Sequence, residues 1–283
     1  MNYGQNFKNI RISKGYSLKE VAEGIISSSF LSKFERGESD ISLSNFILLL
    51  NKLNISIEEY ILISRDYQPS EFEIFLHTIR HAYEQNNIPF LIDIYKEEEK
   101  KWKSHLSSSY KCNYIMTKAL IRDLNRNFEI TNSERNFISD YLLKNDHWGY
   151  YEIILFGNAM CILKYQTVII LAKEIISKSK LNIKIPKIKT EFIRILLNVV
   201  IYTIETGHLD DAKWFLNYID EIPNNTYLYF EKTKHLFLKG LYQIEKNQLN
   251  EGIKNAEKAI EVIGILEDAN IQNNHKLFLK KFI

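Results

Sequence analysis

One short stretch, residues 27–37, limits most strongly what this chain can fold into. It begins with three serines, ends with Gly37, and carries an apolar stripe of Leu31 and Phe34. Ser27 or Ser28 can start a helix by accepting a hydrogen bond from a free backbone N–H, and a glycine can adopt the left-handed conformation that ends one. The opposite side of this helix would be polar, with Ser28, Ser29, Ser32, Lys33 and Arg36. The stretch therefore predicts a short helix with one buried face and one polar face.

A second short helix is predicted immediately upstream. Ser17 and Glu20 have the spacing of a capping box, in which each side chain accepts from the backbone N–H of the other residue. The helix that they open would end at a tight turn at Gly24. Two short helices joined in this way are typical of a helix-turn-helix, whose second helix presents polar N-terminal side chains to the major groove of DNA. An ordinary helical hairpin with a solvated, serine-rich face is the alternative interpretation.

The end of the polar helix resembles a known recognition helix. The run from Ser32 to Glu38 is similar to the S-x-x-E-R-G ending of the recognition helix in Cro/C1-type repressor domains. That resemblance implies a structural salt bridge between Arg11, on the first helix, and Glu35. For contacts with DNA phosphates or bases we expect Lys14, Ser28, Ser29, Phe30, Lys33 and Arg36.

Length and composition favour two α-helical domains. The chain has 283 residues, more than one typical domain, and only four prolines and ten glycines. We expect a five-helix, repressor-type helix-turn-helix domain at residues 1–66 and a repeat domain at residues 67–283. No signal segment or membrane-spanning run is visible, which predicts a cytoplasmic protein without a membrane partner. Cys112 and Cys161 are expected to be buried, reduced thiols.

The predicted DNA-binding domain carries no formal net charge. Residues 1–66 contain eight Lys and Arg and eight Asp and Glu. A DNA-binding protein usually neutralises phosphates with a basic patch, so one such domain should bind weakly. Pairing two domains on a half-site repeat compensates for this weakness. We therefore expect a homodimer that binds double-stranded DNA.

Beyond residue 67 the sequence predicts longer helices in pairs. The first helices of five pairs would begin near Ser70, Leu106, Trp148, Pro186 and Thr226, and their partners near Ile88, Thr131, Tyr165, His208 and Gln248. Residues 206–212 align with residues 246–252 at an offset of 40, and each segment has a small residue that would let two helices approach closely. This period is typical of helical-hairpin arrays and resembles a degenerate tetratricopeptide array. We expect an all-α fold in which about five hairpins form a right-handed superhelix with a concave wall.

The repeat register brings two asparagines into equivalent positions. Asn158 and Asn198 are separated by 40 residues, and Arg80 lies 78 residues before Asn158, about two repeats. Two asparagines in register can pair with the N–H and C=O groups of an extended peptide, and an arginine can clamp a carboxylate. Alternatively, each asparagine satisfies only a helix end or a neighbouring side chain.

A second resemblance covers nearly the whole chain. The segment His147–Asn158 reads HWGYYEIILFGN and resembles the W-G-Y-Y-E-I-x-L-x-G-N segment of the Rgg/GadR/MutR family of bacterial transcriptional regulators. Shorter matches occur at residues 34–39, 53–59 and 229–233. The resemblance implies a homodimeric regulator whose repeat domain binds a short, re-imported pheromone peptide. The residues that it implies for peptide binding are Arg80, Asn158, Asn198 and Phe230.

Other chemistries find no support in the sequence. His77 and His81 are one helical turn apart, but a zinc protease motif needs a glutamate where this chain has Thr78. No glycine-rich phosphate loop or catalytic Cys/His pair is visible, so we expect no enzyme, cofactor or metal site. The leading hypothesis is a sequence-specific regulator switched by a peptide. The alternatives are a scaffold that tethers a protein partner to DNA and a regulator without a ligand.

Overall fold

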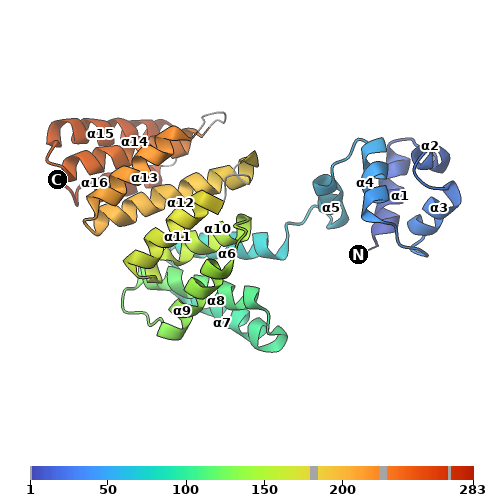
Figure 1. Cartoon of the computed structure of the whole chain (residues 1–283), viewed down its shortest axis with the longest axis horizontal. Helices are drawn as coiled ribbons and strands as arrows, with labels where there is room; N and C mark the ends of the chain where they lie inside the picture. Colours follow the sequence, from blue (N-terminus) through green and yellow to red (C-terminus); the bar gives the residue numbers. More distant parts are fainter. Residues whose placement is uncertain (1, 179–183, 223–227, 267–268) are drawn as a thin grey trace. The chain divides into compact units, whose positions relative to one another are not determined.

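A computed structural model describes residues 2–178, 184–222, 228–266 and 269–283. Within these ranges the chain is helical and contains no β-strand (Figure 1). It divides into two compact units, one ending at His81 and the other beginning at Ala82. The expected all-α fold, with a helix-turn-helix ahead of a helical repeat domain, is confirmed.

The first unit contains α1 (Tyr3–Ser13), α2 (Leu18–Ala22), α3 (Ser28–Glu35), α4 (Leu43–Lys52), α5 (Ile57–Ser64) and most of α6 (Glu71–Glu84). The second unit contains α7 (Ile88–His105), α8 (Ser108–Leu124), α9 (Asn132–Lys144), α10 (Tyr150–Ala159), the 3-10 turn η1 (Met160–Ile162), α11 (Tyr165–Lys178), α12 (Pro186–Glu205), α13 (Leu209–Glu221), α14 (Tyr229–Glu245), α15 (Leu249–Leu266) and α16 (Ala269–Leu279).

Serine side chains start four helices of the first unit. Ser17, Ser27, Ser42 and Ser56 each accept a hydrogen bond from the backbone N–H three residues further on, at distances from 3.1 to 3.3 Å. The capping box predicted at Ser17 is complete, because Glu20 also accepts from the Ser17 N–H at 2.7 Å. These bonds satisfy backbone donors that have no partner within the first helical turn. The helices α2 and α3 therefore start where the sequence predicted.

Two glycines end the helices of the helix-turn-helix. Gly24 has a φ of +76° and Gly37 has a φ of +75°. A Cβ is costly in this left-handed region, so glycine is the residue that adopts it most readily. Gly24 lies in the turn between α2 and α3, and Gly37 follows the last turn of α3, as predicted.

An aromatic cluster forms the core of the first unit. Phe7 packs edge-on against Phe34 with ring centroids 6.0 Å apart, and Phe46 packs edge-on against Tyr60 at 4.9 Å. The four rings come from α1, α3, α4 and α5, so one cluster fixes four helices. Gly4 lets α1 start directly on α3, because a Cβ there would lie 1.9 Å from the Phe34 carbonyl oxygen.

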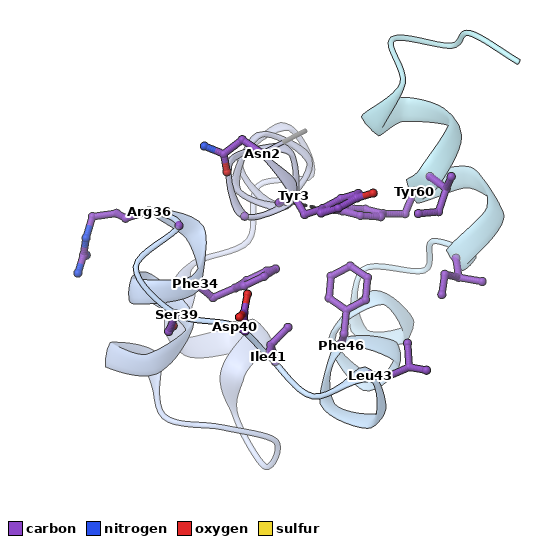
Figure 2. A pocket seen from close by; sticks show the side chains of 14 residues that line it. Asn2, Tyr3, Phe34, Arg36, Ser39, Asp40, Ile41, Leu43, Phe46 and Tyr60 are labelled. Carbon is purple, nitrogen blue, oxygen red and sulfur yellow. Dashed lines mark hydrogen bonds between the residues drawn. The ribbon is translucent and has the colours of Figure 1, made fainter. Parts of the chain in front are cut away.

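A pocket of about 850 Å³ opens beside this core (Figure 2). The rings of Tyr3, Phe34, Phe46 and Tyr60 line it. The Tyr60 hydroxyl donates to the Tyr3 carbonyl oxygen, which ties α5 to α1 across the pocket. The Arg36 side chain points away from these rings in Figure 2 and is exposed.

The helix starts predicted for the repeat pairs agree with the structure. The helices α6 to α15 all begin within three residues of the expected positions, although Thr226 itself lies outside the described residues. Ser70 forms a capping box with Glu73, and Thr131 forms one with Glu134. The sequence did not predict η1 or the last helix, α16.

The second unit is built by stacking the first helices of successive pairs. Helix α8 contacts α10, α10 contacts α12, and α12 contacts α14. Helix α7 packs along α8 and α13 along α12, while α14, α15 and α16 pack in turn at the C-terminal end (Figure 1). Each pair therefore contacts its neighbours, as in a repeat array.

Glycines bring α14 and α15 into backbone contact. A Cβ at Gly252 would lie 2.7 Å from the Gly240 carbonyl oxygen and 2.8 Å from the Ile244 nitrogen. A Cβ at Gly240 would in turn lie 2.7 Å from the Gly252 carbonyl oxygen. Such distances leave no room for a side chain, so both positions require glycine. The small residue that the repeat alignment placed at position 252 thus has the expected role.

The two cysteines are free thiols. Cys112 is buried, as expected, but Cys161 is partly exposed. Burial raises the pKa of each thiol to about 12, so both are neutral at neutral pH.

Across the described residues, no three His, Cys, Asp or Glu side chains cluster where they would hold a metal ion. In the same ranges, no helix is long and apolar enough to cross a bilayer.

Candidate functional site

The outward face of α3 carries most of the side chains predicted to contact DNA. The exposed ones are Ser28, Ser29, Phe30 and Lys33. The inward face is buried, with Leu31 at 0% and Phe34 at 7% exposure. Serine hydroxyls can donate to and accept from base edges, whereas the Phe30 ring can only touch an apolar group such as a thymine methyl. The helix is therefore amphipathic in the sense that a recognition helix requires.

Arg36, at the end of α3, is exposed but engaged within the chain. Its Nε and Nη2 donate to the two carboxylate oxygens of Glu38 at 2.6 and 2.7 Å, and its Nη1 donates to Ser32 Oγ at 2.6 Å. The hydrogen bonds to Glu38 raise the pKa of Arg36, and Arg36 lowers the pKa of the Glu38 carboxyl. Because both side chains are about half exposed, the pair is weak and can exchange for a phosphate.

Arg11 and Glu35 form a buried ion pair between α1 and α3. Arg11 Nε and Nη2 donate to the two Glu35 oxygens at 2.6 and 2.8 Å, and Arg11 Nη1 donates to the Tyr16 carbonyl oxygen at 2.7 Å. The hydrogen bond to Glu35 raises the pKa of Arg11. A bidentate pair fixes direction as well as distance. It holds α3 at a set orientation on α1, a structural function rather than a base contact.

Lys14 has a partner that the sequence did not reveal. Its Nζ donates to the carbonyl oxygen of Leu53, at the end of α4, at 2.8 Å. A cation at a helix C-terminus satisfies an orphan carbonyl and complements the helix dipole. A phosphate contact by Lys14 would have to share or replace this bond. Sequence spacing could not show it, because the two residues are 39 positions apart.

The two asparagines in repeat register lie on helices that touch each other. Asn158 is on α10 and Asn198 is on α12, both are partly exposed, and the two helices are in contact. The contact is close, because a Cβ at Gly157 would lie 2.7 Å from Ile195 Cγ1. Asn158 Nδ2 donates to the Ile154 carbonyl oxygen of its own helix at 2.9 Å. Its Oδ1 has no intrachain hydrogen bond among the described residues and can accept one from a ligand.

A polar seam between α12 and α14 surrounds Asn198. Asn198 Oδ1 accepts from Lys234 Nζ at 3.0 Å. Arg194, one turn earlier on α12, donates from Nε to Glu231 at 2.7 Å and from Nη1 to Glu191 at 2.9 Å. Neither Arg194 nor Lys234 was predicted from the sequence as a site residue. Their spacing could have indicated them. Arg194 is four residues before Asn198 and Lys234 is four residues after Phe230, so each pair lies on one helix face.

The other two residues predicted to bind peptide lie at different places. Phe230 is half-buried in the first turn of α14 and shares a helix face with Lys234. Arg80 is exposed on α6, within the first unit. In the second unit, Lys234 therefore connects two of the predicted residues, because it donates to Asn198 and shares a helix face with Phe230. Asn158 lies on α10, which contacts the helix of Asn198.

These features define a helix-turn-helix regulator with a helical repeat domain. Residues 7–60 match the helix-turn-helix family. Residues 92–277 match the C-terminal domain of the HTH-type transcriptional regulator Rgg. The chain belongs to the Rgg family, which confirms the resemblance found in the sequence; this is a family of transcriptional regulators and not of enzymes.

Solved structures similar to this chain span its whole length. The Streptococcus dysgalactiae SHP pheromone receptor Rgg2 is 27% identical, covers 99% of this chain and 100% of its own, and has a TM-score of 0.82. A putative transcriptional regulator from Listeria monocytogenes EGD-e is 21% identical over 100% and 97% of the two chains, with a TM-score of 0.86. The PrgX/iCF10 complex is 16% identical over 100% and 90%, with a TM-score of 0.74. At these lower identities the likeness concerns the fold.

Proposed function

We propose that this chain is a sequence-specific, homodimeric transcriptional regulator whose binding to double-stranded DNA is switched by a short intracellular peptide. The observation that carries the DNA part is the exposed polar face of α3, held on α1 by the buried Arg11–Glu35 pair. The peptide part is supported by the likeness to a protein described as an SHP pheromone receptor. Asn158, Asn198 and Phe230 would contact the peptide from the repeat unit, with Arg80 as a further contact.

On DNA, the residues of α3 would divide into two roles. Ser28, Ser29 and Phe30 are near the helix N-terminus, which a helix-turn-helix places closest to the base edges. Lys33 and Arg36 would hold phosphates or bases, and Lys14 would contribute from α1. Phosphate contacts set position and affinity, whereas contacts in the groove set sequence preference. Because the helix-turn-helix domain is formally neutral, two copies on paired half-sites would be needed for useful affinity.

Switching requires that the peptide prefer one conformation of the protein. A peptide that contacts α10, α12 and α14 would favour one packing of these helices over another. That preference would change the spacing or mobility of the two paired DNA-binding units. The shift in DNA affinity cannot exceed the difference between the peptide's affinities for the two conformations.

The DNA part is tested with Arg36→Ala. Duplexes are first selected from a random-sequence pool by the full-length protein, and binding is then measured by mobility shift. We expect Arg36→Ala to weaken binding to the selected duplex about 10- to 100-fold, down to its non-specific level, because a bidentate donor is lost. Lys52→Ala, which removes an exposed cation from α4, is the matched control. Unchanged binding by Arg36→Ala would contradict the assignment of α3.

The peptide part is tested by titrating labelled short peptides into the full-length protein. Saturable binding that is weakened by Asn198→Ala supports a peptide-switched regulator. Binding only to a folded protein partner would support a DNA-tethered scaffold instead. Binding to neither would leave a regulator that acts without a ligand.

A further inference from the structure

The polar seam between α12 and α14 leaves one of its two cations without an acidic partner. Arg194 takes both available carboxylates, at 2.7 Å from Glu231 and 2.9 Å from Glu191. Lys234 donates only to the neutral amide oxygen of Asn198, at 3.0 Å. Among the described residues, no Asp or Glu oxygen lies within 4.0 Å of Lys234 Nζ. An ammonium has three donors, so two of them are left for other acceptors.

The surroundings of Lys234 disfavour its positive charge. Desolvation and, to a smaller extent, the charge of Arg194 together lower the pKa of Lys234 to about 8, while Glu231 acts in the opposite direction. His275 on α16 is also close enough that Lys234 lowers its pKa, in addition to the effect of burial. A partly buried ammonium with one neutral acceptor is an unfavourable arrangement for a structural residue. It becomes favourable when an anion binds beside it.

We propose that Lys234 anchors a carboxylate of the peptide bound by the repeat unit, either the C-terminal carboxylate or an Asp or Glu side chain. The inference rests on the proposed peptide-binding function and specifies which chemical group the peptide must carry. A carboxylate provides charged acceptors for the two remaining N–H groups, and such charge-assisted bonds are the strong ones. Asn198 positions the ammonium, and Phe230, one turn earlier on α14, provides apolar contact for the adjoining peptide residue.

This anchor makes peptide binding depend on pH. A bound carboxylate favours the charged ammonium, so the pKa of Lys234 is higher in the complex than in the free protein. Below about pH 8 the free lysine is already protonated, and affinity is at its maximum. As the pH rises above that value, binding must take up a proton, and affinity falls by up to about tenfold per pH unit until the pKa of the complex is reached.

The experiment uses the full-length protein and three pools of synthetic short peptides of random sequence. The first pool lacks Asp and Glu and ends in a free carboxylate, the second is the same pool with a C-terminal amide, and the third is the amide pool with one Asp in each peptide. Retained peptides are identified by mass spectrometry, resynthesised with a fluorophore, and titrated by fluorescence anisotropy. The first and third pools distinguish a terminal from a side-chain carboxylate.

We expect the protein to bind peptides of the first or the third pool, which carry a carboxylate, at least about tenfold more tightly than peptides of the second pool, which carry none. Lys234→Met should lose this preference, because methionine keeps an apolar stem but no charge. Lys232→Met, at an exposed position of the same helix, should retain it. For the unmodified protein, the affinity for the carboxylate peptide should fall between about pH 8 and pH 9.5, while the affinity for the amide peptide stays level.

Equal binding of acid and amide peptides, or a level pH profile for the acid peptide, would overturn the role of Lys234 and leave peptide binding itself intact. Failure of the unmodified protein to retain any pool would instead overturn the proposed peptide function, and the inference with it. The pH profile needs no variant, so the test stands even if Lys234→Met does not fold.

Discussion

Two cations, one in each compact unit, differ in how completely they are paired. In the first unit, Arg11 is 8% exposed and meets both oxygens of Glu35 as well as a backbone carbonyl. In the second unit, Lys234 meets a single neutral amide. A fully paired cation stabilises one arrangement of helices, whereas an incompletely paired one leaves capacity for a ligand. Arg11 therefore has a structural role, whereas Lys234 retains donors that a ligand can use.

The largest effect is expected from removing one half of the buried pair. Glu35→Ala should lower the free energy of unfolding of the first unit by about 3–5 kcal/mol, because it leaves a buried guanidinium without its counter-charge. Hydrogen exchange of α1 and α3, followed by mass spectrometry, measures the change. The three tryptophans lie at positions 102, 148 and 214, so tryptophan fluorescence reports on the second unit alone and should be unaffected. Undiminished protection of α1 would show that the pair is not a brace.

In the second unit, a close backbone contact between α14 and α15 depends on a glycine. Gly252→Ala should reduce the free energy of unfolding by about 2–3 kcal/mol, because the new methyl would press on the backbone of α14. Urea denaturation followed by circular dichroism measures the loss. Gly157→Ala is the comparison, because its Cβ would meet the Ile195 side chain, which can move, and it should cost less. A cost for Gly157→Ala as large as that for Gly252→Ala would argue against the backbone contact.

Lys234→Met should act in the opposite direction and stabilise the second unit. The folded state lowers the pKa of Lys234 to about 8 from its usual 10.5, so below pH 8 the charge opposes folding. We expect a gain of about 1–2 kcal/mol at pH 7, less than full conversion of the shift because the side chain is partly solvated. Since the unfolded chain binds more protons between pH 8 and pH 10.5, the stability of the unmodified protein rises there and the gain disappears. Urea titrations at about pH 7 and pH 10 measure it, and an equal gain at both would contradict the lowered pKa.

The smallest effect is expected at the exposed pair. Glu38→Gln should leave the free energy of unfolding nearly unchanged, because Glu38 and Arg36 are both about half exposed and water screens their interaction. It should nevertheless raise DNA affinity several-fold at low salt, since it frees Arg36 and removes a negative charge near the phosphates. Mobility shifts at increasing salt concentration measure the effect, which should shrink as the charges are screened. Weaker DNA binding would indicate that Glu38 orients Arg36 instead of competing for it.

The helix boundaries were predictable because they depend on neighbouring residues. The capping boxes at Ser17 and Thr131 need only a partner three positions away, so the sequence shows them directly. The same spacing does not always give a full capping box. Ser56 accepts from the Glu59 N–H, but the reciprocal bond from the Ser56 N–H to the Glu59 side chain is not formed. Helix α16 was missed, since it follows the last recognisable repeat.

The polar partners were not predictable, because they come from distant parts of the chain. Lys14 bonds to a carbonyl 39 residues away, and Lys234 bonds to Asn198 from 36 residues away. The repeat offset drew attention to Asn198 alone, and the charged seam around it depends on how α12 and α14 pack. A periodic pattern gives the register of a helix, but the side chains that it meets are set by tertiary contact.

The start of α1 has a practical consequence for biochemical work. Asn2 caps α1, and its side chain lies 3.9 Å from where a Cβ on Gly37 would be, one residue after Arg36. An affinity tag fused ahead of Asn2 would therefore emerge next to the residue expected to hold DNA, and a histidine tag there could mimic or mask an operator contact. Fusion after Ile283, which is 66% exposed, attaches the purification handle to the other compact unit instead.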